Sequence, residues 1–193
     1  MTHNPIIEAT RRWVSDVVIS LNLCPFARRE LVKEGIRFVA TGAASEEALL
    51  MALRDELVYL SEHPEVETTL LIHPAVLQDF MAYNEFLAVV DGLLEQLELV
   101  GIYQIASFHP DYQFGGTEPD DAENYTNRSP YPMLHLLREE SLERAIAGYP
   151  GTDAIPEQNI ELMNRLGADN MRRRLALVKA PDAANCYGQK PQI

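Results

Sequence analysis

Apolar residues recur along this chain at two different spacings, and each spacing predicts a different kind of element. Where they return every third or fourth residue an amphipathic helix is expected, whereas short apolar stretches are typical of strands. Long helices are predicted over residues 6–21, 45–62 and 79–99. Strands are predicted over residues 36–41, 68–73 and 102–109. Ser45 and Asp79 are suited to cap the second and third helices.

The order of these elements predicts an α/β fold. Strands alternate with helices, which is typical of crossover connections in a parallel sheet. We expect a small, mainly parallel three-stranded sheet with flanking helices and a C-terminal helical section. Further helices are predicted over residues 26–34, 156–166 and 170–178, and one more from Pro132 onward. A ferredoxin-like α+β sheet is the alternative, because periodicity does not fix the strand order.

The chain is expected to form one domain over residues 1–179. A mobile tail is expected over residues 180–193, which hold two prolines and few apolar residues. Within the domain, residues 109–130 carry several acidic side chains and almost no apolar periodicity. Connections in compact domains usually run about 4–6 residues, so a loop this long is typical of a functional segment.

Composition and charge exclude several classes of protein. The chain has 193 residues, with 16 lysines and arginines against 29 acidic residues, so its formal net charge is −13. Nonspecific nucleic-acid binding needs clustered cations, so we expect no nucleic-acid partner. The sequence lacks both the apolar run of roughly 18 residues that a membrane span needs and a secretory signal pattern. Since it also has only two cysteines, Cys24 and Cys186, we expect a cytoplasmic protein without a membrane partner.

Two histidines occupy matching places, each directly after a predicted strand and before a proline. They are His73, followed by Pro74, and His109, followed by Pro110. In an open parallel sheet the ligand crevice lies beyond the carboxyl ends of the strands, so both imidazoles are expected at the same edge. The alternative is that each histidine only caps its strand or satisfies a turn amide.

Asp111 lies two residues beyond His109 and is a candidate to orient that imidazole or to share a metal ion with it. Zinc, manganese and iron accept imidazole and carboxylate ligands, so His73, His109 and Asp111 form a candidate site for a divalent metal. No HExxH or CxxC motif accompanies them. An aspartate in an exposed turn is the alternative.

Cys24 is the candidate nucleophile. Pro25 suits a first helical position, which places Cys24 at the N-cap of the helix predicted over residues 26–34. A thiol there faces free backbone amides and the positive end of the helix dipole, and both stabilise a thiolate. The alternative is an inert, packed cysteine, because apolar residues flank it in the sequence.

Three residues that follow the acidic side chains of this loop are candidates to bind an anionic group of a substrate: Asn127, Arg128 and Arg138. An arginine beside helix-terminal amides suits a carboxylate or a phosphate, and Arg128 precedes the helix predicted from Pro132. A small anionic molecule is then the expected ligand. The alternative, of equal weight, is that both arginines pair with the acidic loop and hold it in place.

Three stretches of the chain resemble a known protein family. They are LNLCPFA at residues 21–27, SFHPDYQF at residues 107–114 and NRSPYPMLHLLR at residues 127–138. Together they resemble an uncharacterised, mainly bacterial family that is catalogued as domain of unknown function fourteen-fifteen. The resemblance covers nearly the whole chain. It implies a single-domain bacterial protein and brings no activity, substrate or catalytic residue with it.

The residues themselves favour a small-molecule enzyme of the hydrolase or group-transfer type, with its site at the carboxyl edge of the sheet. In this hypothesis His109 is the general base or a metal ligand, Asp111 orients it, and Cys24 is the nucleophile or a further ligand. The alternative is a noncatalytic protein that binds a metabolite or a partner through the loop of residues 109–130. A redox thiol protein is a third hypothesis.

Overall fold

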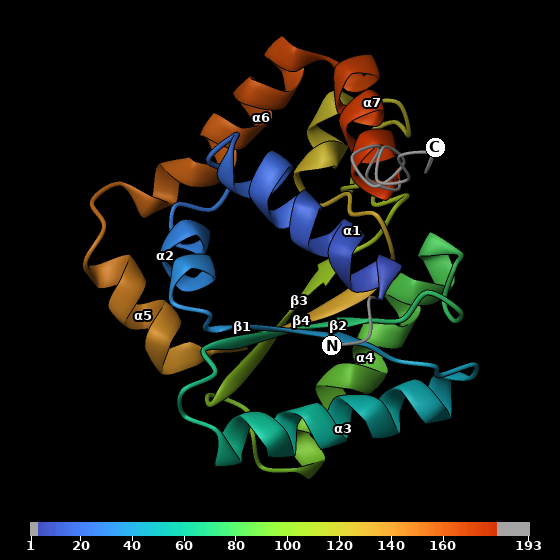
Figure 1. Ribbon diagram of the computed structural model, residues 1–193, viewed down its shortest axis with the longest axis vertical. Coiled ribbons are helices and arrows are strands. Elements are labelled where there is room, and N and C mark those ends of the chain that lie inside the picture. Colours follow the sequence, from blue (N-terminus) through green and yellow to red (C-terminus); the bar gives the residue numbers. More distant parts are fainter. Residues whose placement is uncertain (1–3, 181–193) are drawn as a thin grey trace, which may run out of the picture.

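The computed structural model describes residues 4–180 and has three layers, with a mixed four-stranded sheet between two layers of helices (Figure 1). The strands are β1 (Ile36–Ala40), β2 (Thr68–Ile72), β3 (Tyr103–Phe108) and β4 (Met133–Arg138). The α-helices are α1 (Pro5–Trp13), α2 (Ala27–Val32), α3 (Glu46–Glu62), α4 (Phe80–Gln96), α5 (Glu139–Ala147), α6 (Ile155–Leu166) and α7 (Ala168–Lys179). A π-helical segment η1 (Val14–Ile19) continues α1, and η2 (Ala122–Thr126) and η3 (Thr152–Ala154) are short 3-10 helices. The predicted combination of helices with one sheet is confirmed.

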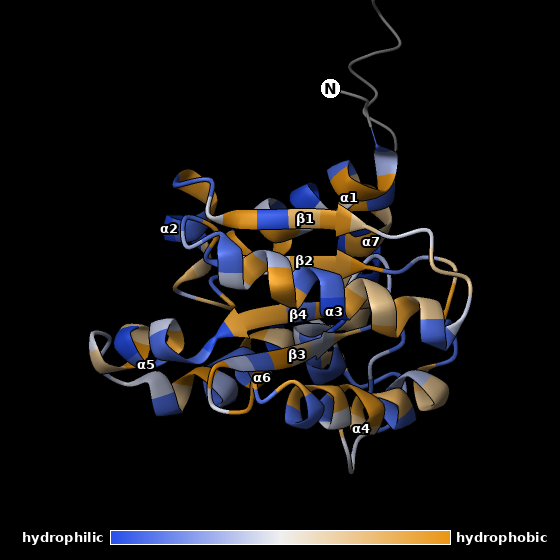
Figure 2. Ribbon diagram, turned by 90° about the horizontal axis from the view of Figure 1, so that it is seen from below, coloured by the Kyte–Doolittle hydropathy of each residue, from blue (hydrophilic) through white to orange (hydrophobic). Residues whose placement is uncertain are grey.

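The sheet has the strand order β1-β2-β4-β3, which differs from the predicted three-stranded parallel sheet (Figure 2). β1 and β2 pair in parallel, whereas β4 lies antiparallel between β2 and β3. All three predicted strands exist and run in the same direction, but β4 separates β3 from β2. The ferredoxin-like alternative is also wrong, because its element order is βαββαβ, whereas here an α-helix follows each of the first two strands and no α-helix lies between β3 and β4.

β4 corrects the helix that leucine spacing predicts from Pro132. Residues Met133–Arg138 form a strand, and the helix begins only at Glu139. Leu134 and Leu136 belong to the core on one face of the sheet, and Met133 belongs to the core on the other. A strand covered on both faces has a continuous apolar run, and periodicity does not distinguish such a run from a buried helical segment.

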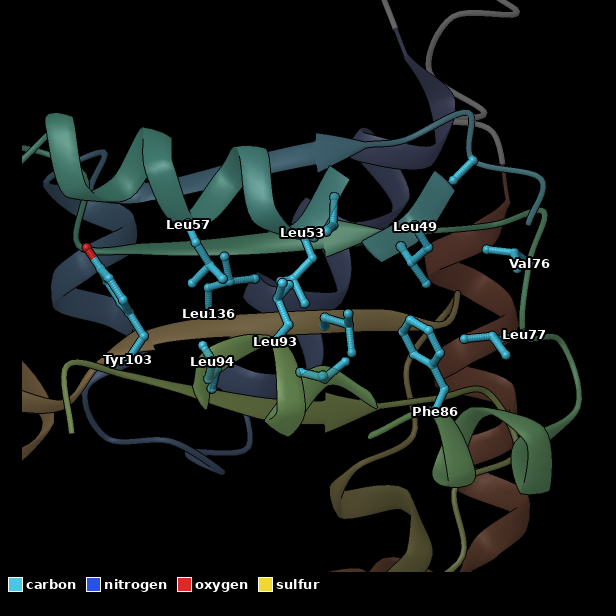
Figure 3. Close-up of a cluster of buried hydrophobic side chains, with 14 of the residues drawn as sticks. Leu49, Leu53, Leu57, Val76, Leu77, Phe86, Leu93, Leu94, Tyr103 and Leu136 are labelled. Carbon is cyan, nitrogen blue, oxygen red and sulfur yellow. The ribbon is translucent and has the colours of Figure 1, made fainter. Parts of the chain in front are cut away.

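One face of the sheet is filled by a leucine-rich core beneath α3 and α4 (Figure 3). Side chains from both helices converge on Leu136 of β4. The leucines that α3 contributes to the buried core are completely buried. The helical members labelled there are Leu49, Leu53 and Leu57 of α3 with Phe86, Leu93 and Leu94 of α4. Both predicted N-caps are confirmed, because Ser45 accepts from the Ala48 amide and Asp79 from the Ala82 amide.

The opposite face of the sheet carries a second core, built with α1, η1, α6 and α7. Its members on β2 and β4 are Leu70, Ile72 and Met133, so it is centred toward the carboxyl end of β2. No helix within residues 4–180 is long and apolar enough to cross a membrane. The predicted mobile tail over residues 180–193 lies outside the described residues, apart from Ala180.

Arg138, the last residue of β4, ties the sheet to the end of α3. Its guanidinium donates hydrogen bonds to the carbonyl oxygens of Leu60, His63 and Val66. Carbonyls in the last turn of a helix lack the amide donor that would lie four residues further on, and a planar guanidinium reaches several of them at once. Arg138 therefore clamps α3 against the sheet.

We expect Arg138→Lys to lower the free energy of unfolding by about 2 kcal/mol, because an ammonium group cannot replace the planar fork of hydrogen bonds to three carbonyls. Urea unfolding measures the difference. Arg144→Lys is the matched control, since Arg144 is exposed on α5 and donates to Glu140 and Ser141 of the same helix. A loss no larger than that of the control contradicts the clamp.

Candidate functional site

The two histidines that follow strands do lie at the same edge of the sheet, because β2 and β3 run in the same direction. Both side chains are completely buried. The Tyr83 ring lies between them, with its centroid 5.8 Å from that of His73 and 5.2 Å from that of His109. The Tyr83 hydroxyl donates to the Met133 carbonyl and accepts from the Phe108 amide, so this cluster helps to join β3 and β4.

Three of the four ring nitrogens of these histidines make structural hydrogen bonds, and the fourth, His73 Nε2, is buried without a partner in the described structure. His109 Nδ1 accepts from the backbone amide of Asp111 at 3.0 Å, so Nε2 carries the proton and donates to the Leu77 carbonyl at 3.2 Å. Burial lowers the pKa of His109 and lowers that of His73 to about 4. His73 donates from Nδ1 to the Val76 carbonyl. The predicted role of Asp111 is therefore met by its backbone amide and not by its carboxylate.

The arrangement gives no support to a metal site at this edge. Both nitrogens of His109 are occupied, and Asp111 is exposed. Among residues 4–180, no three histidine, cysteine, aspartate or glutamate side chains are placed to hold a metal ion.

The acidic loop borders an open groove of about 810 Å³, lined by Asp111, Arg128, Arg172 and Lys179 among others. Arg128 donates to the carbonyls of Tyr112 and Pro119, and its guanidinium lies over the Tyr125 ring. Arg172 pairs with Asp120 at 3.4 Å. These bonds hold the loop in place, which is the alternative that the sequence left open for Arg128. Arg138 lies at the other end of β4 and does not line this groove.

Cys24 lies elsewhere and is not an N-cap residue. α2 begins at Ala27 with Phe26 at the N-cap, so the turn around Pro25 separates Cys24 from the helix. Cys24 lines a second cavity, which neither His109 nor Asp111 borders. The structure therefore does not bring Cys24, His109 and Asp111 together in one site, and the N-cap prediction is wrong.

This second cavity has a volume of about 310 Å³ and lies against the sheet face that carries the second core. α2 and α5 both lie at the end of the sheet where β1 and β2 begin (Figures 1 and 2), and their residues complete its wall. The lining is mainly apolar, and includes Trp13, Val14, Val18, Cys24, Phe26, Thr68, Leu70, Phe108, Asn127, His135, Leu137 and Leu142. Of the predicted site residues, this cavity gathers Cys24 and Asn127, and Arg138 borders it with its guanidinium turned to the end of α3.

His135 is the residue of this cavity that sequence reasoning missed. The Thr68 hydroxyl donates its only hydrogen to the Leu136 carbonyl, so it accepts from His135 Nε2 at 2.8 Å. Nε2 therefore carries the ring proton and Nδ1 is left as an acceptor. Nδ1 has no hydrogen-bond partner among the described residues. It is absent from the fully buried unpaired atoms, and His135 lines the cavity, so Nδ1 is accessible from there. Burial lowers the pKa of His135 to about 4, so the ring is neutral at pH 7.

The wall has two further unused polar atoms. Trp13 Nε1 and Thr126 Oγ1 are buried and have no hydrogen-bond partner in the described structure. Both residues line the cavity. Buried polar groups without partners each cost about 1–3 kcal/mol, so they are uncommon away from functional sites.

Comparison with known proteins gives one match. Residues 5–173 match the family described as "Protein of unknown function (DUF1415)". The chain belongs to this family. No curated protein and no solved structure matches the chain. The range matched to DUF1415 includes every residue that lines the 310 Å³ cavity, whereas the groove extends beyond it to Leu175, Ala176 and Lys179.

The depressed pKa values of His73 and His135 predict acid sensitivity. An unfolded imidazole titrates near 6.5, so between pH 6.5 and 4 the unfolded chain binds protons that the folded chain does not. Stability then falls as the pH is lowered through this window, by at most about 3 kcal/mol for each histidine. Urea unfolding at several pH values measures this loss.

His135→Gln should reduce the loss of stability between pH 6.5 and 4, because unfolding of the variant then takes up about one proton fewer in this range. His63→Gln is the control, because His63 is partly exposed on the surface after α3 and pairs with Glu65. If His135→Gln and His63→Gln give the same slope as the unsubstituted chain, the imidazole of His135 is not held neutral.

Proposed function

We propose that this protein binds a small, mainly apolar molecule in the cavity between the sheet, α1, α2 and α5. One observation carries the proposal: an apolar cavity of about 310 Å³ is lined by an imidazole whose Nδ1 is unpaired. Ligand cavities in proteins have about this size and composition, with few polar groups that fix the orientation of the ligand. The proposal moves the site from the carboxyl edge of the sheet to the opposite end of its second face.

The size of the cavity limits the ligand. An engineered apolar cavity of about 150 Å³ holds benzene, so a cavity twice that volume holds roughly twelve non-hydrogen atoms. Packed protein interiors leave few voids larger than a water molecule. Alanine at positions 27 and 145 and serine at position 141 leave this space open, because larger side chains there would project into it.

α5 has the features of a movable cover. None of its residues is buried, although Leu142 and Ala145 line the cavity. Its apolar side therefore faces the cavity, whereas α3 and α4 face a filled core. Tyr149, just after α5, contacts Phe26 edge to face with 5.7 Å between ring centroids, and both lie at the boundary between α5 and α2. An element with few buried contacts opens locally at low cost in free energy.

Butylbenzene is expected to bind in this cavity and to change the emission of Trp13. Trp13 lines the cavity and is the only tryptophan of the chain, so its fluorescence reports on this site alone. Ala145→Phe should weaken the binding at least tenfold, because the ring occupies the ligand's space, without lowering the melting temperature. Fluorescence titration and thermal unfolding measure the two effects.

Ala147→Phe is the matched control, since Ala147 is exposed on the same helix and does not line the cavity. It should bind butylbenzene as the unsubstituted chain does. The proposed binding site is wrong if butylbenzene neither changes the emission of Trp13 nor raises the melting temperature, or if the two variants behave alike.

A second candidate function is catalysis, of the hydrolase or group-transfer type. The observation that favours it is that the Cys24 thiol lines the same cavity as the neutral imidazole of His135. A thiol and a general base are the two groups that acyl transfer requires, and both line this one cavity. In this version Cys24 and His135 take the roles that the sequence analysis gave to Cys24 and His109. The anionic ligand predicted from Arg128 and Arg138 is not carried forward, because both guanidiniums donate to backbone carbonyls.

A nitrophenyl ester of phenylacetic acid is expected to acylate Cys24, with release of one nitrophenolate per chain. Mass spectrometry of tryptic peptides locates the acyl group, and Cys186→Ser removes the other thiol. His135→Gln should slow acylation at least tenfold, because the general base is lost. This second function is excluded if Cys24 is acylated no faster than a free thiol such as glutathione. It is also excluded if His135→Gln does not change the rate.

A further inference from the structure

We infer that the ligand of this cavity is a small apolar molecule that donates a hydrogen bond to His135 Nδ1, such as an alcohol, and that it is not a carboxylate. This inference rests on the proposed binding function and specifies the chemistry of its ligand. It follows from the order of hydrogen bonds that leads from the backbone of β4 to the cavity.

The first step is the Thr68 hydroxyl. It lies 2.5 Å from the Leu136 carbonyl oxygen, and two oxygens at that distance need a hydrogen between them. A carbonyl has no hydrogen, so the hydroxyl supplies it. Thr68 Oγ1 then has only lone pairs to offer to any further partner.

The second step is the imidazole. His135 Nε2 lies 2.8 Å from Thr68 Oγ1, and since the hydroxyl is already a donor, Nε2 must be the donor of this bond. A neutral imidazole carries one proton, so Nδ1 has a lone pair and no hydrogen. Two partners within the sheet thus fix the tautomer of His135 before any ligand enters.

The third step is the identity of the ligand group. The only partner that satisfies an acceptor nitrogen is a donor, and a group without a hydrogen leaves Nδ1 unpaired in an apolar environment. A hydroxyl or an amine meets this requirement, and an ether does not. Sites that hydrogen-bond a ligand hydroxyl discriminate strongly against analogues that lack it.

The charged residues that border the cavity also disfavour an anionic ligand. The cavity is bordered by two carboxylates, Glu30 and Glu67, and by Arg138. The Arg138 guanidinium donates to the carbonyls of Leu60, His63 and Val66, and among residues 4–180 the ion-pair partner of Glu30 is the exposed Arg29. Glu67 has no ion pair in the described structure. An anionic ligand would meet like charge and an acceptor nitrogen.

Three probes of matched size test the inference: phenylbutanol, its methyl ether and phenylbutyrate. The change in Trp13 emission gives the dissociation constant of each. We expect the alcohol to bind about tenfold tighter than the ether, and phenylbutyrate to bind at least tenfold weaker than the alcohol. Butylbenzene is included as the probe of the cavity itself.

His135→Leu should reduce the difference between alcohol and ether to less than twofold, because the acceptor nitrogen is lost. Thr68→Val should reduce it as well, because the tautomer is no longer fixed. His63→Leu is the control, since His63 lies outside the cavity, and it should keep the tenfold difference.

The outcomes separate this inference from the function on which it rests. If no probe binds, including butylbenzene, the proposed binding site is wrong. If butylbenzene binds but the alcohol and the ether bind equally, or phenylbutyrate binds as tightly as the alcohol, the cavity is real and the inference about its ligand is overturned. A tenfold difference that survives in His135→Leu also overturns it.

Discussion

The antiparallel insertion of β4 between β2 and β3 is the constraint on which this structure depends. Because successive side chains of a strand point to opposite faces, six residues serve two different environments. Leu134 and Leu136 complete the core under α3 and α4, while His135 faces the cavity on the other side. Arg138 then fixes the end of the strand to α3. Any shift of β4 by one residue would exchange the two faces.

The helices fill one face of the sheet and leave a cavity on the other. α3 and α4 are long and supply leucines that fill one face (Figure 3). On the other face, the second core covers the part near Ile72 and Met133, and the short helices α2 and α5 cover the rest without burying a residue of their own. A filled core would be more stable there, so the open space is a cost in stability that proteins commonly bear at functional sites.

The sequence was sufficient to predict the elements with a clear period and insufficient for those without one. β1, β2 and β3, the long helices and the caps Ser45 and Asp79 follow from spacing and local hydrogen bonding. β4 does not, because Leu134 and Leu137 fit a helical period and its true partners, β2 and β3, are distant in the chain. Missing β4 also hid His135, whose environment depends on Thr68, 67 residues away in the chain.

The histidines at the carboxyl edge show a different limit of sequence reasoning. Their placement follows from strand direction, but their burial depends on Tyr83 of α4, which no local pattern connects to them. A histidine that uses its ring nitrogens on backbone atoms holds the fold together, whereas one with a free nitrogen beside a cavity is available to a ligand. His109 is of the first kind and His135 of the second. The distinction lies in what the second nitrogen contacts, and for His135 that is decided by the single hydrogen of Thr68.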